Sequence, residues 1–168
     1  MKVLSIDIGV RNLCIVEIII VKEDTICLKN IECTLLDLIG DKSVKKCKVS
    51  DLLDELIKQL SIYDPKSYDY ILIENQMTGN PKCKNISIVC YTYFRMINKQ
   101  TLFVSSKLKL GIPGQKLTYI QKKKAAVIEC YKLLNDEQIN KLELLHRQHD
   151  AADAILQCFF WFQKSGLI

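Results

Sequence analysis

At 168 residues, the chain has room for one ordinary domain, because independent domains usually need roughly 100–150 residues each, so a two-domain ATPase is not expected. Hydrophobic residues make up 49% of the chain and charged residues 26%, with only 6 Gly and 3 Pro, which indicates a compact core rather than a disordered chain. The 24 Lys and Arg against 19 Asp and Glu leave a net charge of +5, which permits a polyanionic partner without requiring one. We therefore expect a single folded domain over residues 1–168.

Three strands are predicted at the start of the chain. Lys2–Asp7 is a short apolar run that ends in Asp-Ile-Gly, and residues 13–21 and 25–34 are rich in β-branched side chains, with polar Asp24 between them. We expect these consecutive strands to pair antiparallel.

A helix and a buried strand follow in the middle of the chain. Apolar residues at positions 49, 52, 53, 56, 57 and 60 recur with helical spacing and predict an amphipathic helix that ends before Pro65. Residues 68–74 (YDYILIE) close on a continuous apolar run, which favours a central strand covered on both faces. After a turn at residues 79–81, we expect a helix over residues 86–97 and a short strand at Thr101–Ser105.

The last third of the chain is predicted to be mostly helical. Residues 108–115 contain two glycines and a proline and indicate a loop, which precedes helices over residues 118–134 and 148–162. The whole order predicts an α/β fold built on a mixed β-sheet, in which three antiparallel strands are followed by parallel strands, with helices on both faces.

Four acidic residues stand where this fold can bring them together. Asp7 ends the first strand, Glu74 ends the fourth, and Asp150 and Asp153 share one face near the start of the final helix. A cluster of carboxylates requires cations, and sites rich in oxygen suit Mg²⁺ or Mn²⁺. Two such ions about 3.5–4 Å apart can activate a water and stabilise the leaving oxygen in phosphodiester hydrolysis.

Three of these acids also have a structural explanation. An aspartate beside a glycine after a strand, such as Asp7, is often only a turn residue, and Asp150 and Asp153 could simply favour the N-terminal end of a helix. Glu74 is more informative, because a carboxylate that closes an apolar strand is costly unless it reaches solvent, a partner or a metal. For His149, the roles of supporting residue, occasional metal ligand and solvated surface residue stay open.

In this order, the motifs resemble those of a known family. The succession of Ser-Ile-Asp-Ile-Gly-Val-Arg-Asn, Ile-Glu-Asn-Gln and His-Asp-Ala-Ala-Asp-Ala is similar to the RuvC-like Holliday junction resolvases of the RNase H-like superfamily. Residues 73–76, the block 85–94 (NISIVCYTYF) and the block 119–127 (YIQKKKAAV) resemble the poxvirus branch of that family. The resemblance covers nearly the whole chain, and the order of all blocks is far more specific than Asp-Ile-Gly alone.

The resemblance implies an endodeoxyribonuclease that resolves four-way (Holliday) junctions by paired symmetric nicks, as in the resolution of viral concatemers. It implies a homodimer that acts on branched DNA in the cytoplasm of the infected host cell. The family's catalytic and metal-binding acids correspond to Asp7, Glu74, Asp150 and Asp153. They would bind Mg²⁺, with Mn²⁺ as a substitute and two ions per active site, and Gln76 and His149 would support them.

A basic segment lies between the last predicted strand and the final helix. Residues 105–132 hold seven lysines and one acid, a net charge of +6, so the rest of the chain carries −1. Clustered lysines suit a surface that follows a phosphate backbone without reading bases, although a solvated helix face is the usual fate of such a run. The lysines predicted to contact DNA are Lys107, Lys109, Lys116, Lys122, Lys123 and Lys124.

Other interpretations remain beside this one. Residues 86–97 should lie mostly in the core, with any exposed edge a candidate dimer surface, while Tyr91 and Tyr93 are either structural or stack on unpaired bases. An RNA-processing nuclease of the same fold and a non-catalytic junction-binding protein are the alternative functions. A sugar-kinase or actin-like ATPase is disfavoured by the short chain, which lacks a second glycine-rich phosphate loop.

The cysteines and the apolar runs bear on where the chain resides. The 8 cysteines contain no Cys-x-x-Cys pair, and several lie in apolar runs, which favours reduced thiols inside a cell. One combination of four residues could be considered as a zinc site, but its spacing matches no usual pattern of zinc ligands. The four residues are Cys83, Cys90, His146 and His149. Asp7 and Arg11 interrupt the first apolar run, and no run approaches about 20 residues, so we expect neither a signal peptide nor a membrane span.

Overall fold

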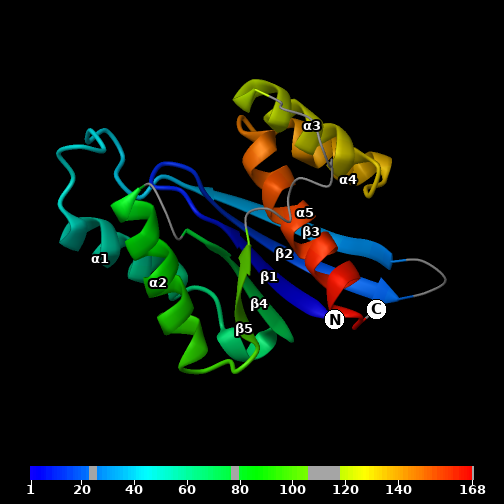
Figure 1. The fold of residues 1–168 in the computed structure, drawn as a ribbon, viewed down its shortest axis with the longest axis horizontal. Coiled ribbons are helices and arrows are strands. Elements are labelled where there is room, and N and C mark those ends of the chain that lie inside the picture. Colours follow the sequence, from blue (N-terminus) through cyan, green and yellow to red (C-terminus); the bar gives the residue numbers. More distant parts are fainter. Residues whose placement is uncertain (23–25, 77–79, 106–117, 168) are drawn as a thin grey trace.

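One mixed β-sheet forms the centre of the computed structural model, which describes residues 1–22, 26–76, 80–105 and 118–167 (Figure 1). The strands lie in the order β3-β2-β1-β4-β5. Their bounds are β1 (Lys2–Asp7), β2 (Leu13–Lys22), β3 (Ile26–Leu36), β4 (Tyr70–Asn75) and β5 (Thr101–Ser105). The pairs β1–β2 and β2–β3 are antiparallel, whereas β1–β4 and β4–β5 are parallel. The prediction of three antiparallel strands followed by parallel strands is confirmed.

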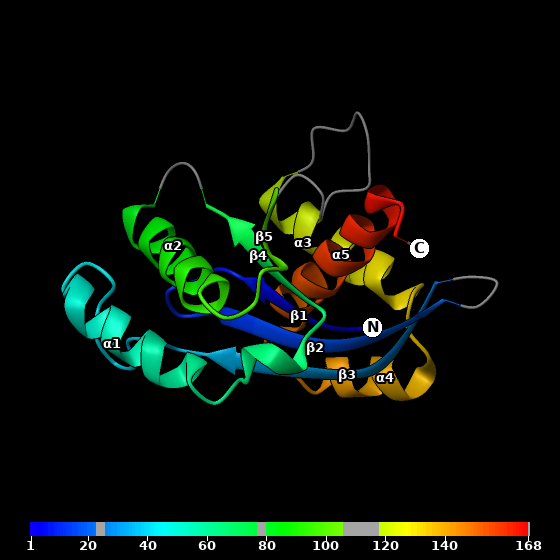
Figure 2. The ribbon, with the colours of Figure 1, turned by 90° about the horizontal axis from the view of Figure 1, so that it is seen from below.

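Helices cover both faces of this sheet, as predicted (Figures 1 and 2). On one face, α1 (Val49–Leu60) and α2 (Pro81–Arg95) pack on side chains such as Leu4 and Ile6 of β1. On the other face, α3 (Tyr119–Tyr131), α4 (Asp136–Glu143) and α5 (Gln148–Ser165) pack on residues such as Val3 and Leu72. Alternate residues of a strand point to opposite faces, so β1 and β4 contribute to both cores. A single 3₁₀ turn, η1 (Pro65–Ser67), precedes β4.

Helix α2 begins five residues earlier than the sequence pattern predicts. The segment expected to be a turn supplies its cap: the side chain of Asn80 accepts hydrogen bonds from the amides of Lys82 and Cys83, at 3.0 and 3.5 Å. Pro81 occupies the first helical position, where its missing N–H costs nothing. The Asn-Pro pair therefore starts the helix instead of closing a turn before it.

Helix α4 was not predicted, and α3 ends at Tyr131 rather than at residue 134. Asn135 and Gln138 form a reciprocal capping box at the start of α4, with bonds of 2.9 and 3.0 Å between each side chain and the other residue's amide. Only Leu142 of this eight-residue helix is buried. So short a helix presents too few apolar residues for a periodic pattern to be visible.

A buried polar cluster fixes α5 across the middle of the sheet. The hydroxyl of Ser5 donates to the carbonyl of Ala154 at 2.7 Å. The amide of Gln157, which is fully buried, donates to the hydroxyl of Ser5 and to the carbonyls of Ile6 and Leu72, at 3.3 to 3.4 Å. These contacts tie the helix to both β1 and β4, so they set the position of its first turn relative to the ends of those strands.

All eight cysteines are free thiols, in agreement with the prediction of reduced cysteines. Cys14, Cys90, Cys130 and Cys158 have no exposed surface. Burial raises the pKa of the Cys90 and Cys130 thiols to about 12, which keeps them protonated at neutral pH. None of the described helices combines the length and the apolar character needed to cross a membrane.

Candidate active site

The ends of β1 and β4 carry Asp7 and Glu74 to one place. The two strands run parallel with Ser5 opposite Leu72 and Ile6 opposite Ile73, so the next residues along each strand are Asp7 and Glu74. Strand alternation puts Asp7 on the same face as Ser5, which contacts α5. Both carboxylates are nearly buried, with exposed fractions of 7% for Asp7 and 5% for Glu74.

Two donors orient the carboxylate of Glu74. The backbone amide of Ile8 donates to Oε2 at 3.2 Å, and the side-chain amide of Gln76 donates to the same oxygen at 2.6 Å. The hydroxyl of Ser87 on α2 donates to the carbonyl of Glu74 at 2.7 Å and fixes the backbone there. Gln76 thus lies where a supporting residue would lie, and the amide of Ile8 adds a contact that the sequence did not predict.

The first turn of α5 brings Asp150 to the same face, with Asp153 one turn further on. Asp150 is 6% exposed, and three basic side chains surround it. Its Oδ1 lies 3.2 Å from Nζ of Lys123 and 3.3 Å from Nε2 of His149, and its Oδ2 lies 3.1 Å from Nε of Arg147. Burying a carboxylate is costly unless it is paired, so these contacts offset that cost.

The contacts of Asp150 are close but poorly aligned. Among the described residues, Oδ2 of Asp150, Nε of Arg147 and Nε2 of His149 are buried atoms that make no hydrogen bond of proper geometry. Burial lowers the pKa of His149, and the charges of Lys123 and Arg147 lower it further against the opposing effect of Asp150. For Lys123, burial lowers the pKa, but the contacts with Tyr119 and Asp150 outweigh it and raise the pKa overall.

These side chains line a cleft of about 380 Å³. The four predicted acids belong to its wall, together with basic and polar groups from three other segments. Those groups are Asn12 from the loop after β1, Tyr119, Lys122 and Lys123 from α3, and Arg147 from the turn before α5. Carboxylates beside lysine and arginine side chains suit an anionic ligand. The carboxylates would bind such a ligand through metal cations, and the basic side chains would bind it directly.

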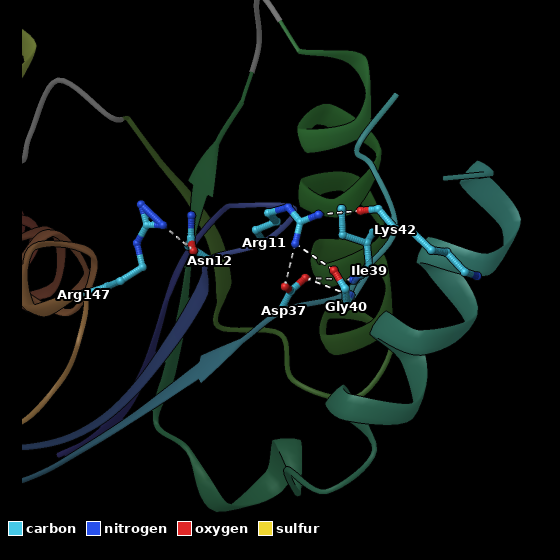
Figure 3. A network of polar contacts seen from close by, with 7 residues as sticks. All are labelled: Arg11, Asn12, Asp37, Ile39, Gly40, Lys42 and Arg147. Atoms are coloured by element: carbon cyan, nitrogen blue, oxygen red, sulfur yellow. Dashed lines mark hydrogen bonds and ion pairs between the residues drawn. The ribbon is translucent and has the colours of Figure 1, made fainter. Parts of the chain in front are cut away.

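The loop after β1 depends on a glycine. A Cβ atom added to Gly9 would lie 2.6 Å from the carbonyl oxygen of Asn12, so no other residue fits without moving the backbone. The side chain of Asn12 accepts a 2.7 Å hydrogen bond from Arg147 (Figure 3). This bond ties the loop to the start of α5. On the other side, Arg11 binds Asp37 at 3.0 Å and the carbonyl of Gly40 at 2.7 Å.

The six predicted DNA-contacting lysines divide into three groups. Lys122 and Lys123 line the acidic cleft, whereas Lys124 lines a neighbouring groove of about 290 Å³ with Ile128 and His149. The others, Lys107, Lys109 and Lys116, lie outside the described residues. Tyr91 and Tyr93, proposed alternatively to stack on bases, pack within the protein on Phe103 and Phe94 at centroid distances of 4.3 and 5.2 Å.

The donors in the cleft fit a hard divalent cation in kind. They are carboxylate oxygens, the ligands that Mg²⁺ and Mn²⁺ prefer, and Oδ2 of Asp150 is buried with no hydrogen bond. In the described part of the chain, however, no three His, Cys, Asp or Glu side chains are arranged to hold a metal ion. The same observation gives no support to a zinc site at Cys83, Cys90, His146 and His149.

Sequence reasoning missed Asn12, Arg147 and the amide of Ile8. A signal existed for Arg147, because it precedes Asp150 by three residues and can therefore reach it along the helix. The partnership of Arg147 with Asn12 joins residues 135 positions apart, and only the fold reveals it.

Comparisons with known proteins bear on the family and the fold. A family model described as Poxvirus A22 protein matches residues 1–162, whereas no curated protein sequence matches. Fowlpox virus resolvase bound to Holliday junction DNA has a similar structure, with a TM-score of 0.66 and 18% identity over 98% of this chain and 99% of that one. Thermus thermophilus RuvC gives 0.62 and 11% over 99% and 97%, and the yeast mitochondrial Holliday junction resolvase gives 0.61 and 17% over 98% and 78%. The predicted RNase H-like, RuvC-like fold is confirmed.

Proposed function

The chain belongs to the poxvirus A22 protein family, and from this membership and its acidic cleft we propose that it is an endodeoxyribonuclease that resolves four-way (Holliday) junctions. The observation that carries the proposal is the meeting of Asp7, Glu74, Asp150 and Asp153 in one cleft beside lysine and arginine side chains. Fowlpox virus resolvase and Thermus thermophilus RuvC, which share the fold, are both known as complexes with Holliday junction DNA.

The four acids would hold Mg²⁺, or Mn²⁺ in its place, with two ions per active site. Asp7 and Glu74 would supply oxygens from the sheet, and Asp150 and Asp153 would supply oxygens from α5. The bound ions would supply an activated water and a stabilised leaving oxygen for phosphodiester hydrolysis. Gln76 and the Ile8 amide would keep the Glu74 carboxylate turned to one orientation, and His149 would support Asp150.

The basic side chains around the cleft would bind the DNA backbone. Three basic side chains line the cleft itself, those of Lys122, Lys123 and Arg147. They would contact the phosphates nearest the bond that is cleaved. Lys124 would add to this binding, and so would the predicted contacts Lys107, Lys109 and Lys116, which are outside the described residues. Such contacts do not read bases, which suits an enzyme that selects the shape of its DNA substrate.

A homodimer would give the enzyme two cuts per junction. Large apolar side chains lie exposed on α2, just after its end and on the edge strand β5, among them Ile88 (46% exposed), Met96 (82%) and Phe103 (39%). A second copy packed there by twofold symmetry would cover them and present two clefts to a junction of matching symmetry. The paired symmetric nicks would leave ends that can be ligated, as the resolution of viral concatemers in the cytoplasm of an infected cell requires.

A cleavage assay on defined substrates tests this function. The purified protein should nick a synthetic four-way DNA junction in Mg²⁺ or Mn²⁺, should leave a linear duplex of the same sequence intact, and should lose activity when EDTA removes the metal. Preferential cleavage of structured RNA would instead support the RNA-processing nuclease. Tight binding to the junction without cleavage in either metal would support the non-catalytic junction-binding protein.

A further inference from the structure

Asp150 is neutralised by side chains of the protein itself. Nζ of Lys123 lies 3.2 Å from Oδ1, and Nε of Arg147 lies 3.1 Å from Oδ2, so each oxygen has a cationic neighbour. The two side chains are enclosed as well. Taken without the backbone, the side chain of Lys123 is 20% exposed and that of Asp150 is 9% exposed. An ion pair this sheltered from solvent is screened much less than one on the surface.

The two cations differ in how firmly they are held. Arg147 is anchored from its other end, because its guanidinium donates a 2.7 Å hydrogen bond to Asn12. Lys123 has a flexible stem and a second favourable position nearby, since its ammonium group already lies 5.0 Å from the centre of the Tyr119 ring. Tyr119 is 71% exposed and lines the cleft. Lys123 can therefore leave Asp150 without losing every partner, whereas Arg147 cannot move without releasing the loop after β1.

We propose that Lys123 is an internal counter-cation that holds the place of a metal ion on Asp150 and is displaced when the divalent metal binds. This inference rests on the proposed function, because it takes the four acids as the metal site. The displaced ammonium group remains in the cleft, beside Tyr119 and Lys122, where a DNA phosphate would meet it. Metal binding and the arrival of a positive charge at the substrate are thus coupled through one side chain.

The arrangement of the acids is consistent with such an exchange. No three metal-ligating side chains of the described residues are arranged to hold an ion, although four carboxylates line one cleft. With Lys123 and Arg147 in contact, the carboxylate of Asp150 is oriented by α3 and by the turn before α5 rather than by a metal. A divalent ion offers more charge than an ammonium group and can replace it at hard oxygen ligands.

The competing explanation is that the Lys123–Asp150 pair only braces α3 against α5. The two helices already share a packed apolar contact that includes Ala126, Cys130 and Ala151. A brace predicts that removing Lys123 weakens metal binding, because Asp150 becomes less well positioned. Displacement predicts the opposite direction, since the metal no longer competes with the lysine.

Titration calorimetry with Mn²⁺ on the full-length protein, without DNA, separates these explanations. Lys123→Met should bind Mn²⁺ about three- to tenfold more tightly than the unmodified protein, the size expected for loss of a competing, partly buried ion pair. Lys122→Met is the matched control for the loss of one positive charge in the cleft, because Lys122 lines the same cleft but makes no ion pair among the described residues. It should change the affinity by less than about twofold. Lys123→Gln should repeat the direction seen with methionine, which guards against a defect of one variant.

The possible outcomes distinguish a failure of the displacement role of Lys123 from a failure of the proposed function. Unchanged or weaker Mn²⁺ binding in folded Lys123→Met and Lys123→Gln overturns the displacement role while leaving the nuclease function standing. Equal tightening in Lys122→Met also overturns it, because the effect would then come from net charge alone. If the unmodified protein binds no Mn²⁺ and cuts no junction, the proposed function itself fails, and the displacement role fails with it.

Discussion

The backbone amide of Ile8 donates a 3.2 Å hydrogen bond to Oε2 of Glu74, and this contact joins the end of β1 to the end of β4. The two residues lie 66 positions apart, yet the bond makes the loop after β1 part of the carboxylate's support. The same loop accepts a hydrogen bond from Arg147 through Asn12. The conformation of the five residues between β1 and β2 therefore bears on acids from β4 and α5 alike.

Gly9→Ala should disrupt this loop. The new Cβ would lie 2.6 Å from the carbonyl oxygen of Asn12, so the backbone must move and both loop contacts should weaken. We expect a loss of about 1–3 kcal/mol in the free energy of unfolding, measured in urea, and a fall of at least about tenfold in the rate of junction cleavage.

Gly166→Ala provides the matched control for Gly9→Ala. Gly166 has a φ of +67° at the end of α5, where a Cβ meets no atom within 4 Å. The substitution should cost about 1–2 kcal/mol of stability through backbone strain alone and leave cleavage unchanged. A Gly9→Ala variant that cleaves as fast as the Gly166→Ala variant would show that the loop does not support the acids.

Gln157→Leu should affect activity more than stability. The substitution removes hydrogen bonds of 3.3 to 3.4 Å but also removes Oε1, a buried atom with no partner among the described residues. These effects oppose each other, so we expect the free energy of unfolding to change by less than about 1 kcal/mol. Without this contact, α5 is less well fixed over β1, and cleavage should slow by about tenfold.

Ser5→Ala tests whether Ser5 and Gln157 act together. The two side chains are joined by a 3.3 Å hydrogen bond, so the double variant should lose little more activity than either single one. Fully additive losses in cleavage rate would contradict a shared role in positioning α5.

Ile88→Glu should prevent dimer formation if α2 forms the interface. A charge buried between two copies is unfavourable, so analytical ultracentrifugation should find monomers, and junctions should receive unpaired nicks. Ile57→Glu on α1 is the control, because Ile57 is 44% exposed and Ile88 is 46% exposed, yet they lie on different helices. Monomers from the Ile57 variant, or dimers from the Ile88 variant, would place the interface elsewhere.

The buried thiols should make stability fall at high pH. Burial raises the pKa of Cys90 to about 12 from an ordinary value of 9.0. Between these values the unfolded chain releases a proton that the folded protein keeps, so stability is complete below pH 9 and decreases as the pH rises above it. Each such thiol contributes a slope of about 1.4 kcal/mol per pH unit.

Urea unfolding of the Cys90→Val variant measures this contribution. Between pH 9 and pH 11, the slope of the unfolding free energy against pH should become shallower than in the unmodified protein. The expected difference is about 1.4 kcal/mol per pH unit, which corresponds to one proton per molecule. An identical slope in the two proteins would mean that Cys90 ionises as readily in the folded state as in the unfolded chain.

Much of the fold follows from periodicity, and its exceptions have local causes. The strands β1, β2 and β4 were predictable because alternating or continuous apolar runs match one or two buried faces. The start of α2 was missed because Asn80-Pro81 is equally typical of a turn and of a capped helix. Helix α4 was missed because its single buried residue, Leu142, leaves no pattern.

The candidate site divides in the same way. The four acids could be located because strand ends and helix faces have fixed directions once the fold class is known. The Ile8 amide that helps to orient Glu74 and the bond between Asn12 and Arg147 could not, since they join residues 66 and 135 positions apart. Such contacts depend on the packed arrangement, which no local sequence pattern encodes.

The central claim is that carboxylates of the cleft perform the cleavage of a four-way junction, and the variants Asp7→Asn and Glu74→Gln test it most directly. Each keeps the size of the side chain while removing a charge that a metal requires. In an assay that follows binding and nicking of one labelled junction in Mg²⁺, we predict that both variants bind the junction about as well as the unmodified protein and lose cleavage by at least about a thousandfold. Cleavage retained in either variant at a rate near that of the unmodified protein would contradict the account.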